Sequence, residues 1–503
     1  MCAAGSVSTV LSRAPLGLAA PLVRVEVHIG PGLPAFALVG LPEAAVRESR
    51  ERVRSALLTS GFEFPAHRIT VNLSPAELPK EGGRFDLPIA IGILTASGQL
   101  TPRAVQRREF YGELALTGEL RETPRLLPAL LAGTRTGSQL ILPAANALEA
   151  GWIAGQDVRL ARDLRAVWSA LSGLSSLPAA ELCSLAASSS PGLDLADVRG
   201  QYCAKRALEI AAAGGHALLM IGAPGAGKTL LAQRLPGLLP PLELDEALEV
   251  ACLESAAGRR PSLGNRRPFR SPQHTASVAA LIGGRGLRPG ELSLAHLGIL
   301  FLDELPEFAR NALEALREPL ESGVVMVCRA KQTCEFPARF QLIAAMNPCP
   351  CGHAGGASGR CRCTAEQVAR YRDRISGPLI DRIDMHVELG TVPPDELLAE
   401  GPPPESSAIV AGRVAAARAL QRRRQGKLNV QLDPAELAAM CGLSREGRTL
   451  IGTAIARLGL SARAYHRVLK LARTCADLAG EAEIRCVDIS EAVRLRALDR
   501  ATC

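Results

Sequence analysis

The sequence predicts a multidomain α/β protein with an N-terminal α/β domain, a central parallel-sheet domain that carries a phosphate-binding loop (P-loop), and a helical C-terminal domain. Three observations support this fold class. The chain has 503 residues, 47% of them hydrophobic, which is enough for several cores at roughly 100–200 residues per domain. From residue 22 to about 389, short β-type runs alternate with helical runs, and residues 222–229 form a glycine-rich loop between two such runs. Residues 408–503 contain no convincing strand pattern.

The first part of the chain is read as alternating strands and helices. Strands are expected at residues 23–29, 36–39, 68–73 and 139–142, and helices at 43–60 and 87–97. A stretch rich in Ser, Ala, Leu and Pro then follows. We therefore predict a domain at residues 1–172 and a linker at 173–192.

Two more domains are expected after this linker. In residues 193–390 strands and helices alternate as in a parallel-sheet nucleotide-binding domain. Residues 391–407 contain five prolines and are predicted to be a second linker. The remaining residues, 408–503, are helical by period and composition.

The strongest functional signal is the glycine-rich loop, which lies between an apolar strand at 217–221 and a helix-forming run at 230–235. It satisfies the G-x-x-x-x-G-K-[ST] pattern with Gly222, Ala223, Pro224, Gly225, Ala226, Gly227, Lys228 and Thr229. In such a loop backbone N–H groups surround phosphates, Lys228 reaches the β- and γ-phosphates of ATP, and the Thr229 hydroxyl coordinates Mg²⁺. A glycine-rich turn that happens to contain Lys-Thr is the structural alternative.

Two later strands end in polar residues suited to the same site. The apolar run 297–302 is followed by Asp303, assigned to the Mg²⁺ shell, and Glu304, assigned as the general base that polarises water. A solvated acidic turn is the alternative for this pair. The strand at 340–345 leads to Asn347, whose amide can orient the water against the γ-phosphate, although Asn before Pro is often a turn residue.

Arginines near one helix end and in the C-terminal helices are further candidates. Arg374 and Arg382 are both placed so that one of them can reach a neighbouring subunit's nucleotide as an arginine finger. An ion pair with Asp381 or Asp384 is an equally weighted alternative. Arg463 is a weaker candidate for a nucleotide contact, because surface arginines are common in this chain.

A cysteine cluster offers a metal site. Cys349, Cys351, Cys361 and Cys363 form two Cys-x-Cys pairs separated by nine residues. Four thiolates can close a tetrahedral Zn²⁺ site in a reducing compartment, where a disulfide would not persist. A loop with unligated cysteines is weighed equally, because zinc knuckles more often use Cys-x-x-Cys.

Composition excludes some functions and permits others. Aromatic residues make up only 3% of the chain, which argues against aromatic base-stacking surfaces, and the net charge of +8 permits a polyanionic partner. The longest uncharged stretch, 210–227, is broken by glycines and a proline, so no membrane span is expected. No secretory signal pattern is present, so a cytoplasmic protein is expected. Arginine-rich segments that can contact phosphates lie at 259–260, 266–270, 284–288 and 422–424.

These motifs resemble the ComM/YifB family, the magnesium-chelatase-like AAA+ ATPases linked to bacterial competence. The resemblance spans nearly the whole chain and is carried by residues 40–43, 48–54, 69–73, 78–88, 222–229, 267–272, 289–296 with 303–304, and 347–352. It implies an N-terminal domain of the Lon-protease-like fold, a central AAA+ domain of the chelatase and MCM clade, and a helical C-terminal lid. It also implies that Arg382 is the arginine finger and Arg463 the sensor-2 arginine.

The resemblance implies a function as well. Such proteins are associated with hexameric rings that bind DNA, here expected to be single-stranded or branched, and that use ATP and Mg²⁺ to drive branch migration of recombination intermediates. Two departures from the family pattern lie in the insertion before Asp303. Gln273 stands where a second His is usual, and the glycine loop at 283–286 is altered.

Two other functions fit parts of the sequence. Peptidases of the Lon-like fold carry a serine nucleophile in a Lys-x-Gly-x-Ser stretch, whereas this chain has Lys80-Glu-Gly-Gly-Arg84 and so lacks the nucleophile for acyl transfer. A magnesium chelatase motor that remodels a protein or metallo-cofactor partner is the closer alternative, because its ATPase core is similar. The expected order is DNA motor, then chelatase-type remodelling, then protease.

Overall fold

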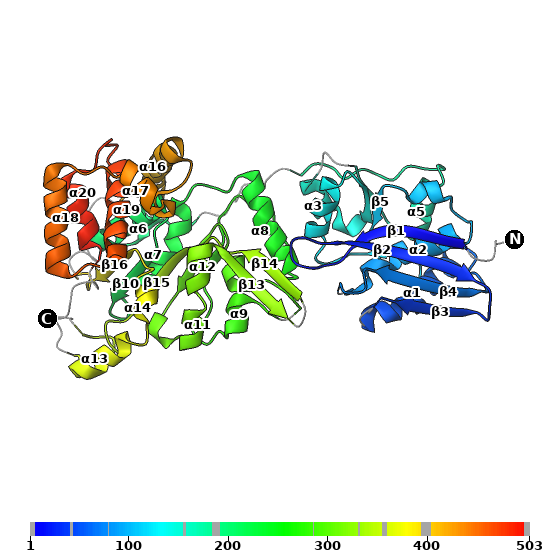
Figure 1. Ribbon diagram of the computed structural model, residues 1–503, viewed down its shortest axis with the longest axis horizontal. Helices are drawn as coiled ribbons and strands as arrows, with labels where there is room; N and C mark the ends of the chain where they lie inside the picture. Colours follow the sequence, from blue (N-terminus) through cyan, green and yellow to red (C-terminus); the bar gives the residue numbers. More distant parts are fainter. Residues whose placement is uncertain are drawn as a thin grey trace.

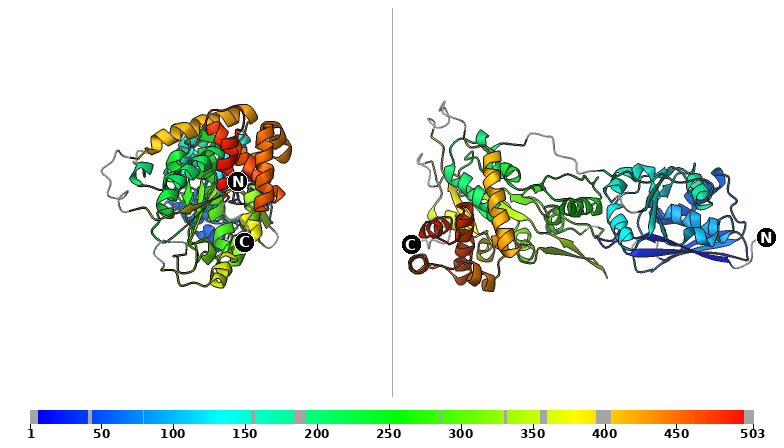
Figure 2. Two further views of the ribbon diagram at one scale, coloured as in Figure 1. Left: turned by 90° about the vertical axis from the view of Figure 1, so that its left-hand side faces the viewer. Right: turned by 90° about the horizontal axis from the view of Figure 1, so that it is seen from above.

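The fold is described from a computed structural model that covers residues 6–40, 44–78, 80–153, 157–183, 192–284, 286–329, 332–354, 360–393 and 404–496. These residues form three parts in a line: an N-terminal sheet with helices, a central parallel sheet, and a group of C-terminal helices (Figure 1). Seen from above, the three parts again follow one another along the long axis (Figure 2). The predicted mixed α/β class, with a parallel sheet and a helical C-terminal part, is confirmed.

The N-terminal sheet has seven strands in the order β3-β4-β2-β1-β5-β8-β9. Its strands are β1 (Ser6–Arg13), β2 (Leu22–Gly30), β3 (Ala35–Val39), β4 (Arg68–Ser74), β5 (Arg108–Phe110), β8 (Gln139–Pro143) and β9 (Val158–Ala161). β1 is antiparallel to β2 and parallel to β5, so it joins a mainly antiparallel half to a parallel half. The four strands expected from the sequence in this part are confirmed, each slightly longer than expected.

Helices cover this sheet. They are α1 (Ala44–Thr59), α2 (Asp86–Ala96), α3 (Leu127–Arg135), α4 (Ala147–Trp152) and α5 (Leu164–Leu171). α2 packs on β1 and β2, and all of its residues are buried, including its first residue, Asp86. That carboxylate accepts a hydrogen bond from Arg52 Nε on α1 at 2.7 Å, which satisfies a charge inside the core. The helices expected at 43–60 and 87–97 are confirmed.

β1 was not expected from the sequence, because its buried positions carry polar side chains. Ser8 and Arg13 are 6% exposed, yet Ser8 Oγ donates to the Gly92 carbonyl at 2.7 Å and Arg13 Nε donates to Glu109 at 2.8 Å. Buried polar groups are tolerated when they are hydrogen-bonded in this way. Hydropathy alone therefore does not reveal this strand.

The central sheet has five parallel strands in the order β11-β12-β15-β10-β16. They are β10 (Leu218–Gly222), β11 (Phe269–Arg270), β12 (Ile299–Leu302), β15 (Gln341–Met346) and β16 (Met385–Leu389). Their residues are almost all buried, as expected for a sheet covered on both faces. Along β10, Leu218 and Met220 face one core, whereas Leu219 and Ile221 face the other.

Short helices and a hairpin surround the central sheet. The helices are α6 (Tyr202–Gly214), α7 (Lys228–Arg234), α8 (Leu244–Ala256), α9 (Val278–Ile282), α10 (Glu291–Leu294), α11 (Arg310–Glu314), α12 (Arg317–Ser322), α13 (Ala365–Arg372) and α14 (Gly377–Ile380). The hairpin pairs β13 (Val324–Arg329) with β14 (Gln332–Pro337) and was not expected from the sequence. It projects toward the N-terminal part, where Gln332 Nε2 donates to the Glu77 carbonyl at 2.6 Å (Figure 1).

The C-terminal part is helical. It contains α16 (Ser407–Gln425), α17 (Pro434–Met440), α18 (Arg445–Leu458), α19 (Ala462–Leu478) and α20 (Cys486–Arg494), and no strand occurs within the described residues 404–496. α16 and α19 pack on α6, and side chains of these helices share one hydrophobic core with β10 and β16. The C-terminal helices are thus a continuation of the central core.

The N-terminal and central parts meet at α3 and α8. Apolar side chains of both helices form one hydrophobic cluster. Beside it, buried Arg125 donates to the Ala256 carbonyl at 3.1 Å and to the Pro15 carbonyl at 2.8 Å, and it pairs with Glu81 at 2.8 Å. The junction therefore combines apolar burial with a satisfied charge.

The two predicted linkers lie partly outside the described residues, at 184–191 and 394–403. The described pieces of these segments contain no helix or strand before α16 begins at Ser407. Across the part of the chain that the structure describes, no helix is both long enough and apolar enough to cross a membrane.

Candidate nucleotide site

Three strands of the central sheet end beside one another at the carboxyl edge. β10 leads into the loop 223–227, β12 into Asp303 and Glu304, and β15 into Asn347. β10 lies between β15 and β16, although it comes first in the chain, so the strand order reverses at this point. Ligands of open α/β sheets bind at such a position.

The loop after β10 ends at the buried Lys228, the first residue of α7. Its Nζ donates to the Gly222 carbonyl at 2.6 Å, to the Ala223 carbonyl at 3.1 Å and to Asn347 Oδ1 at 3.1 Å. Burial lowers the pKa of Lys228. Gly227 has φ +90°, a backbone conformation that glycine adopts without strain. The ammonium thus lies where the loop and the end of β15 meet.

The side chains expected to hold Mg²⁺ are brought together. Thr229 Oγ1 donates to Asp303 Oδ2 at 2.8 Å, and the Glu304 backbone N–H donates to Asp303 Oδ1 at 3.0 Å. A hydroxyl and a carboxylate are hard oxygen ligands of the kind that Mg²⁺ takes, usually one or two per site beside phosphate oxygens and water. The donor set therefore fits Mg²⁺ bound with ATP.

Glu304 projects from an unusual backbone conformation. Its φ is +53°, in the left-handed region, and its side chain is half-exposed. His274 Nδ1 lies 3.4 Å from Glu304 Oε2, a contact that sequence reasoning missed, since it treated the segment around His274 only as a departure from a family pattern. Arg374 pairs with Glu307, just beyond Glu304, at 2.9 Å.

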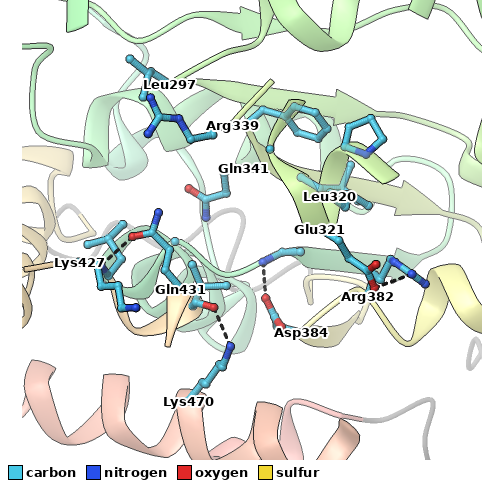
Figure 3. A pocket seen from close by; sticks show the side chains of 18 of the residues that line it. Leu297, Leu320, Glu321, Arg339, Gln341, Arg382, Asp384, Lys427, Gln431 and Lys470 are labelled. Atoms are coloured by element: carbon cyan, nitrogen blue, oxygen red, sulfur yellow. Dashed lines mark hydrogen bonds and ion pairs between the residues drawn. The ribbon is translucent and has the colours of Figure 1, made fainter. Parts of the chain in front are cut away.

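A cavity of about 770 Å³ lies at the opposite, amino edge of the same strands (Figure 3). It is lined by Ala217 before β10, Gly298 before β12 and Phe340 before β15, and by Arg382 and Arg463. Among the described residues that line it, none belongs to the loop 222–229. Arg382 and Arg463 thus lie together, at the opposite edge of the sheet from Lys228.

Arg382 is held by local contacts directly after α14. Its guanidinium donates to the Pro378 carbonyl at 2.7 Å. It also pairs with Glu321 at 2.5 Å, and this pair is drawn in Figure 3. Within the described residues its carboxylate partner is therefore Glu321, whereas the sequence offered Asp381 or Asp384 as the alternative to an arginine finger.

Arg463 and Arg467 lie one turn apart on α19. Arg463 is exposed at the cavity, whereas Arg467 donates to the Arg382 carbonyl at 3.0 Å and pairs with the buried Asp384. Burial alone raises the pKa of Asp384, but Arg467 and the nearby His216 outweigh burial and hold that pKa well below its ordinary value. Arg467 therefore connects α19 to the segment that carries Arg382, a role that spacing along the chain did not reveal.

The N-terminal stretch compared with peptidases is closed by its own contacts. Lys80 is fully buried and its Nζ donates to the Gly40 carbonyl at 3.1 Å. Arg84, where a serine would be needed, is 4% exposed and donates to the carbonyls of Pro124 and Arg125 at 2.7 and 3.2 Å. Burial lowers the pKa of Arg84 to about 10. A buried guanidinium thus stands where acyl transfer would need a hydroxyl.

Several arginines of the insertion before β12 are already paired. Arg270 contacts Glu291 at 2.6 Å and Arg259 contacts the same carboxylate at 2.9 Å. Arg288 is exposed, and Arg285 lies outside the described residues.

The predicted cysteine cluster is assembled, since the sulfurs of Cys349, Cys351, Cys361 and Cys363 all lie within 4.8 Å of one another. Cys349 and Cys351 follow Asn347 closely, so the cluster lies beside the carboxyl edge of the sheet.

Comparisons with known proteins agree with this geometry. The family described as magnesium chelatase, subunit ChlI, matches residues 194–397; related ChlI families match residues 25–146 and, as the ChlI C-terminal region, residues 404–496. The chain is 49% identical over 502 residues to the competence protein ComM of Haemophilus influenzae, covering 98% of both chains. This chain belongs to the ComM/YifB family of magnesium-chelatase-like proteins. It is also 49% identical over 498 residues to the uncharacterized protein YifB of Escherichia coli, again covering 98% of both.

Membership of the ComM/YifB family gives the site its coarse chemistry. The magnesium-chelatase-like AAA+ match indicates an ATPase that uses ATP and Mg²⁺. A more distant relative is the DNA helicase MCM8 of Bos taurus, 26% identical over 217 residues, which are 42% of this chain and 22% of that protein. The fold around the candidate site, a parallel sheet with a phosphate loop after its first strand, fits this assignment.

Proposed function

We propose that the chain is an ATP-driven ring motor that acts on DNA. The observation that carries this proposal is the separation of the candidate residues: Lys228, Asp303 and Glu304 lie at the carboxyl edge of the sheet, and Arg382 and Arg463 lie in the cavity at its amino edge. One chain cannot bring both sets to one nucleotide. A head-to-tail ring joins the carboxyl edge of each subunit to the amino edge of the next. We infer a homohexamer, the state that the family resemblance implies.

In this proposal the carboxyl edge prepares ATP for attack by water. Lys228 balances the charge of the β- and γ-phosphates, for which its ammonium must leave the loop carbonyls. Thr229 and Asp303 hold Mg²⁺, which supplies electrostatic stabilisation of the phosphoryl oxygens. Glu304 accepts the proton of the attacking water, and Asn347 orients that water.

The amino edge of the next subunit completes the site. Arg382 stabilises the charge that develops on the transferred phosphoryl group, and Arg463 adds a second contact to the phosphates. Two present contacts must break first: Arg382 leaves Glu321, whose side chain is 60% exposed, and Glu304 leaves His274. Both pairs are open to water on at least one side, so exchanging them for nucleotide contacts costs little.

The DNA part of the proposal is supported by relatives and by charge. One relative is named a competence protein and a distant one a DNA helicase. The net charge of +8 permits a polyanionic partner, and Arg288 is exposed in the insertion that precedes β12. We assign single-stranded or branched DNA as the partner, branch migration of recombination intermediates as the activity, and the cytoplasm as the location.

We also propose the following division of the chain. Residues 1–172 form a non-proteolytic Lon-protease-like domain, residues 193–390 an AAA+ domain of the chelatase type, and residues 408–503 the lid, joined by linkers at 173–192 and 391–407. The separate sheets of the first two parts support this division. α16 and α19 of the proposed lid share a hydrophobic core with α6 of the AAA+ domain. The boundary between these two domains is therefore drawn from the sequence, because the packing is continuous across it.

The test is steady-state ATP hydrolysis by the purified protein, alone and with single-stranded or forked DNA. DNA is expected to raise the rate, and Glu304→Gln is expected to lower it by about 10²–10⁴-fold while ATP still binds. Arg370→Ala, on the exposed face of α13, is the matched surface control and should hydrolyse normally. Strand displacement on forked DNA then tests the motor directly.

Magnesium-chelatase-type remodelling is the second candidate, because the family that matches the ATPase part is that of a chelatase subunit. Hydrolysis that depends on Glu304 but is indifferent to every DNA tested would favour this candidate. Absence of hydrolysis in the presence of Mg²⁺ and DNA would refute both.

A further inference from the structure

The four sulfurs of the cysteine cluster have the spacing of ligands to a single metal ion. Cys349 Sγ lies 3.3 Å from Cys351 Sγ and 3.8 Å from Cys361 Sγ, and the last two sulfurs are 3.7 Å apart. These three sulfurs and the sulfur of Cys363 all lie within 4.8 Å of one another. Four thiolates at the usual Zn–S length of about 2.3 Å in a tetrahedron are about 3.8 Å apart. The sulfur positions therefore match a tetrahedral site of that size.

The same spacing argues for one ion rather than a cluster. In an iron–sulfur cluster the cysteines bind different irons across a cage of sulfides, so their sulfurs are held farther apart than around one ion. A backbone group also faces the site, because the Ala354 N–H donates to Cys349 Sγ at 3.3 Å. Hydrogen bonds of this kind from outside the ligand set orient and stabilise metal-bound thiolates.

The cluster lies against the candidate ATP site. Cys349 and Cys351 follow Asn347 within the same turn, and the Gly352 N–H donates to the Cys349 carbonyl at 2.9 Å. Gly352 has φ +81°, and a Cβ at this position would lie 2.6 Å from Cδ of Pro224 in the phosphate loop and 3.9 Å from Cγ of Asn347. The backbone between the cysteine pairs therefore packs directly on the phosphate loop.

We propose that Cys349, Cys351, Cys361 and Cys363 bind one Zn²⁺ ion, and that this ion fixes the turn at residues 347–352 against Pro224 and so supports ATP binding. Each thiol gives up its proton on binding, and no electron is transferred. The turn joins Asn347 at one end to the metal at the other, so loss of the ion releases one wall of the nucleotide site. The zinc site stands on the sulfur geometry alone, whereas its effect on ATP rests on the proposed function.

The first experiment measures metal in the full chain. Protein purified under reducing conditions without chelator, and supplied with Zn²⁺ before desalting, is analysed by mass spectrometry for zinc and iron. We expect about one zinc per chain. Cys361→Ser with Cys363→Ser should lose it, whereas Cys203→Ser with Cys486→Ser, exposed cysteines outside the cluster, should keep it. Iron in place of zinc, or no bound metal in the unsubstituted protein, overturns the proposal.

The second experiment measures ATP binding with a fluorescent ATP analogue and Mg²⁺. Unsubstituted protein stripped with a zinc-selective chelator, and shown by circular dichroism to remain folded, should bind with a Kd raised about tenfold, equal to about 1.4 kcal/mol. Added zinc should restore the affinity. Gly352→Ala should keep its zinc yet bind ATP more weakly, because its Cβ cannot fit against Pro224.

The two parts of the proposal fail separately. An unchanged Kd after removal of zinc refutes the support of ATP binding. Protein that binds no ATP in either metal state refutes the proposed nucleotide site, while the measured zinc content still decides the metal site.

Discussion

Mixing two inactive variants should restore ATP hydrolysis, because Glu304 and Arg382 lie at opposite edges of one sheet. Glu304→Gln removes the proposed base at the carboxyl edge and is expected to lower the rate by about 10²–10⁴-fold. Arg382→Ala removes the proposed finger at the amino edge and is expected to lower it by about 10³–10⁵-fold. Neither variant alone should hydrolyse ATP at a useful rate. A mixed ring, however, contains interfaces at which one subunit supplies an intact Glu304 and its neighbour an intact Arg382.

The size of the recovery follows from this arrangement. In an equimolar mixture assembled at random, the subunit that supplies the carboxyl edge of an interface has an intact Glu304 in about half of the interfaces. Independently, the neighbour that supplies the amino edge has an intact Arg382 in about half of them, so about one quarter of the interfaces have both residues. Hydrolysis should therefore return to about 25% of the unsubstituted rate, whatever the number of subunits in the ring. If both residues served the nucleotide of their own chain, no site would be complete.

The assay is steady-state hydrolysis after the two variants are combined as monomers and then assembled with nucleotide. The matched control mixes Arg382→Ala with Arg463→Ala. Both arginines line the cavity of the same chain, so no interface in this mixture receives both, and no recovery is expected. If the mixture of Glu304→Gln and Arg382→Ala hydrolyses ATP no faster than either variant alone, the shared site is refuted. Recovery in the control would mean that Arg382 and Arg463 serve different nucleotides.

Three other changes have defined outcomes. Asp384→Asn should lower the free energy of unfolding by about 3 kcal/mol, since it leaves Arg467 without its buried partner. Because the folded pKa of Asp384 is depressed, this contribution is complete above the unfolded-state pKa of about 4 and is lost progressively as the pH falls from there through the lower folded pKa. Urea unfolding at about pH 7 and pH 3 should therefore show the full difference between the variant and the unsubstituted protein at pH 7 and a smaller difference at pH 3. Thr229→Ala should weaken Mg²⁺-dependent ATP binding by about tenfold in titrations with Mg²⁺, with Mg²⁺-free binding unchanged. Arg84→Ser should give no peptidase activity in a fluorogenic casein assay and should lower the thermal midpoint, because two carbonyls lose their buried donor.

The sequence was sufficient to predict the strands that carry chemistry. β10, β12 and β15 are runs of apolar residues buried on both faces, and the polar residues that matter follow each run directly. Because parallel strands end at one edge, the proximity of Thr229 to Asp303 and of Lys228 to Asn347 follows from the pattern. The distances in the structure agree with this prediction.

Other features could not be predicted, for physical reasons. The buried face of β1 carries the polar residues Ser8 and Arg13, whose hydrogen-bond partners are distant in sequence, so the strand lacks an apolar pattern. The approach of His274 to Glu304 depends on tertiary packing of a loop that has no periodic pattern. Spacing along the chain also could not say that Arg463 lies at the amino edge, because that depends on how α19 packs on α6. Local pattern predicts an element, but not the face on which a distant element packs.

Lys228 and Arg382 lie at opposite edges of one sheet, so in the proposed ring the rate of ATP hydrolysis per chain depends on protein concentration. A solitary chain would hold nucleotide without consuming it, and turnover per molecule would rise with the amount of protein until the ring is filled. At low concentration the protein would then bind ATP without hydrolysing it, and hydrolysis would begin only where the local concentration is high enough for rings to assemble. The amount of protein made and its recruitment to one place would therefore set a threshold concentration for ATP hydrolysis, a form of control that no single residue of the site provides.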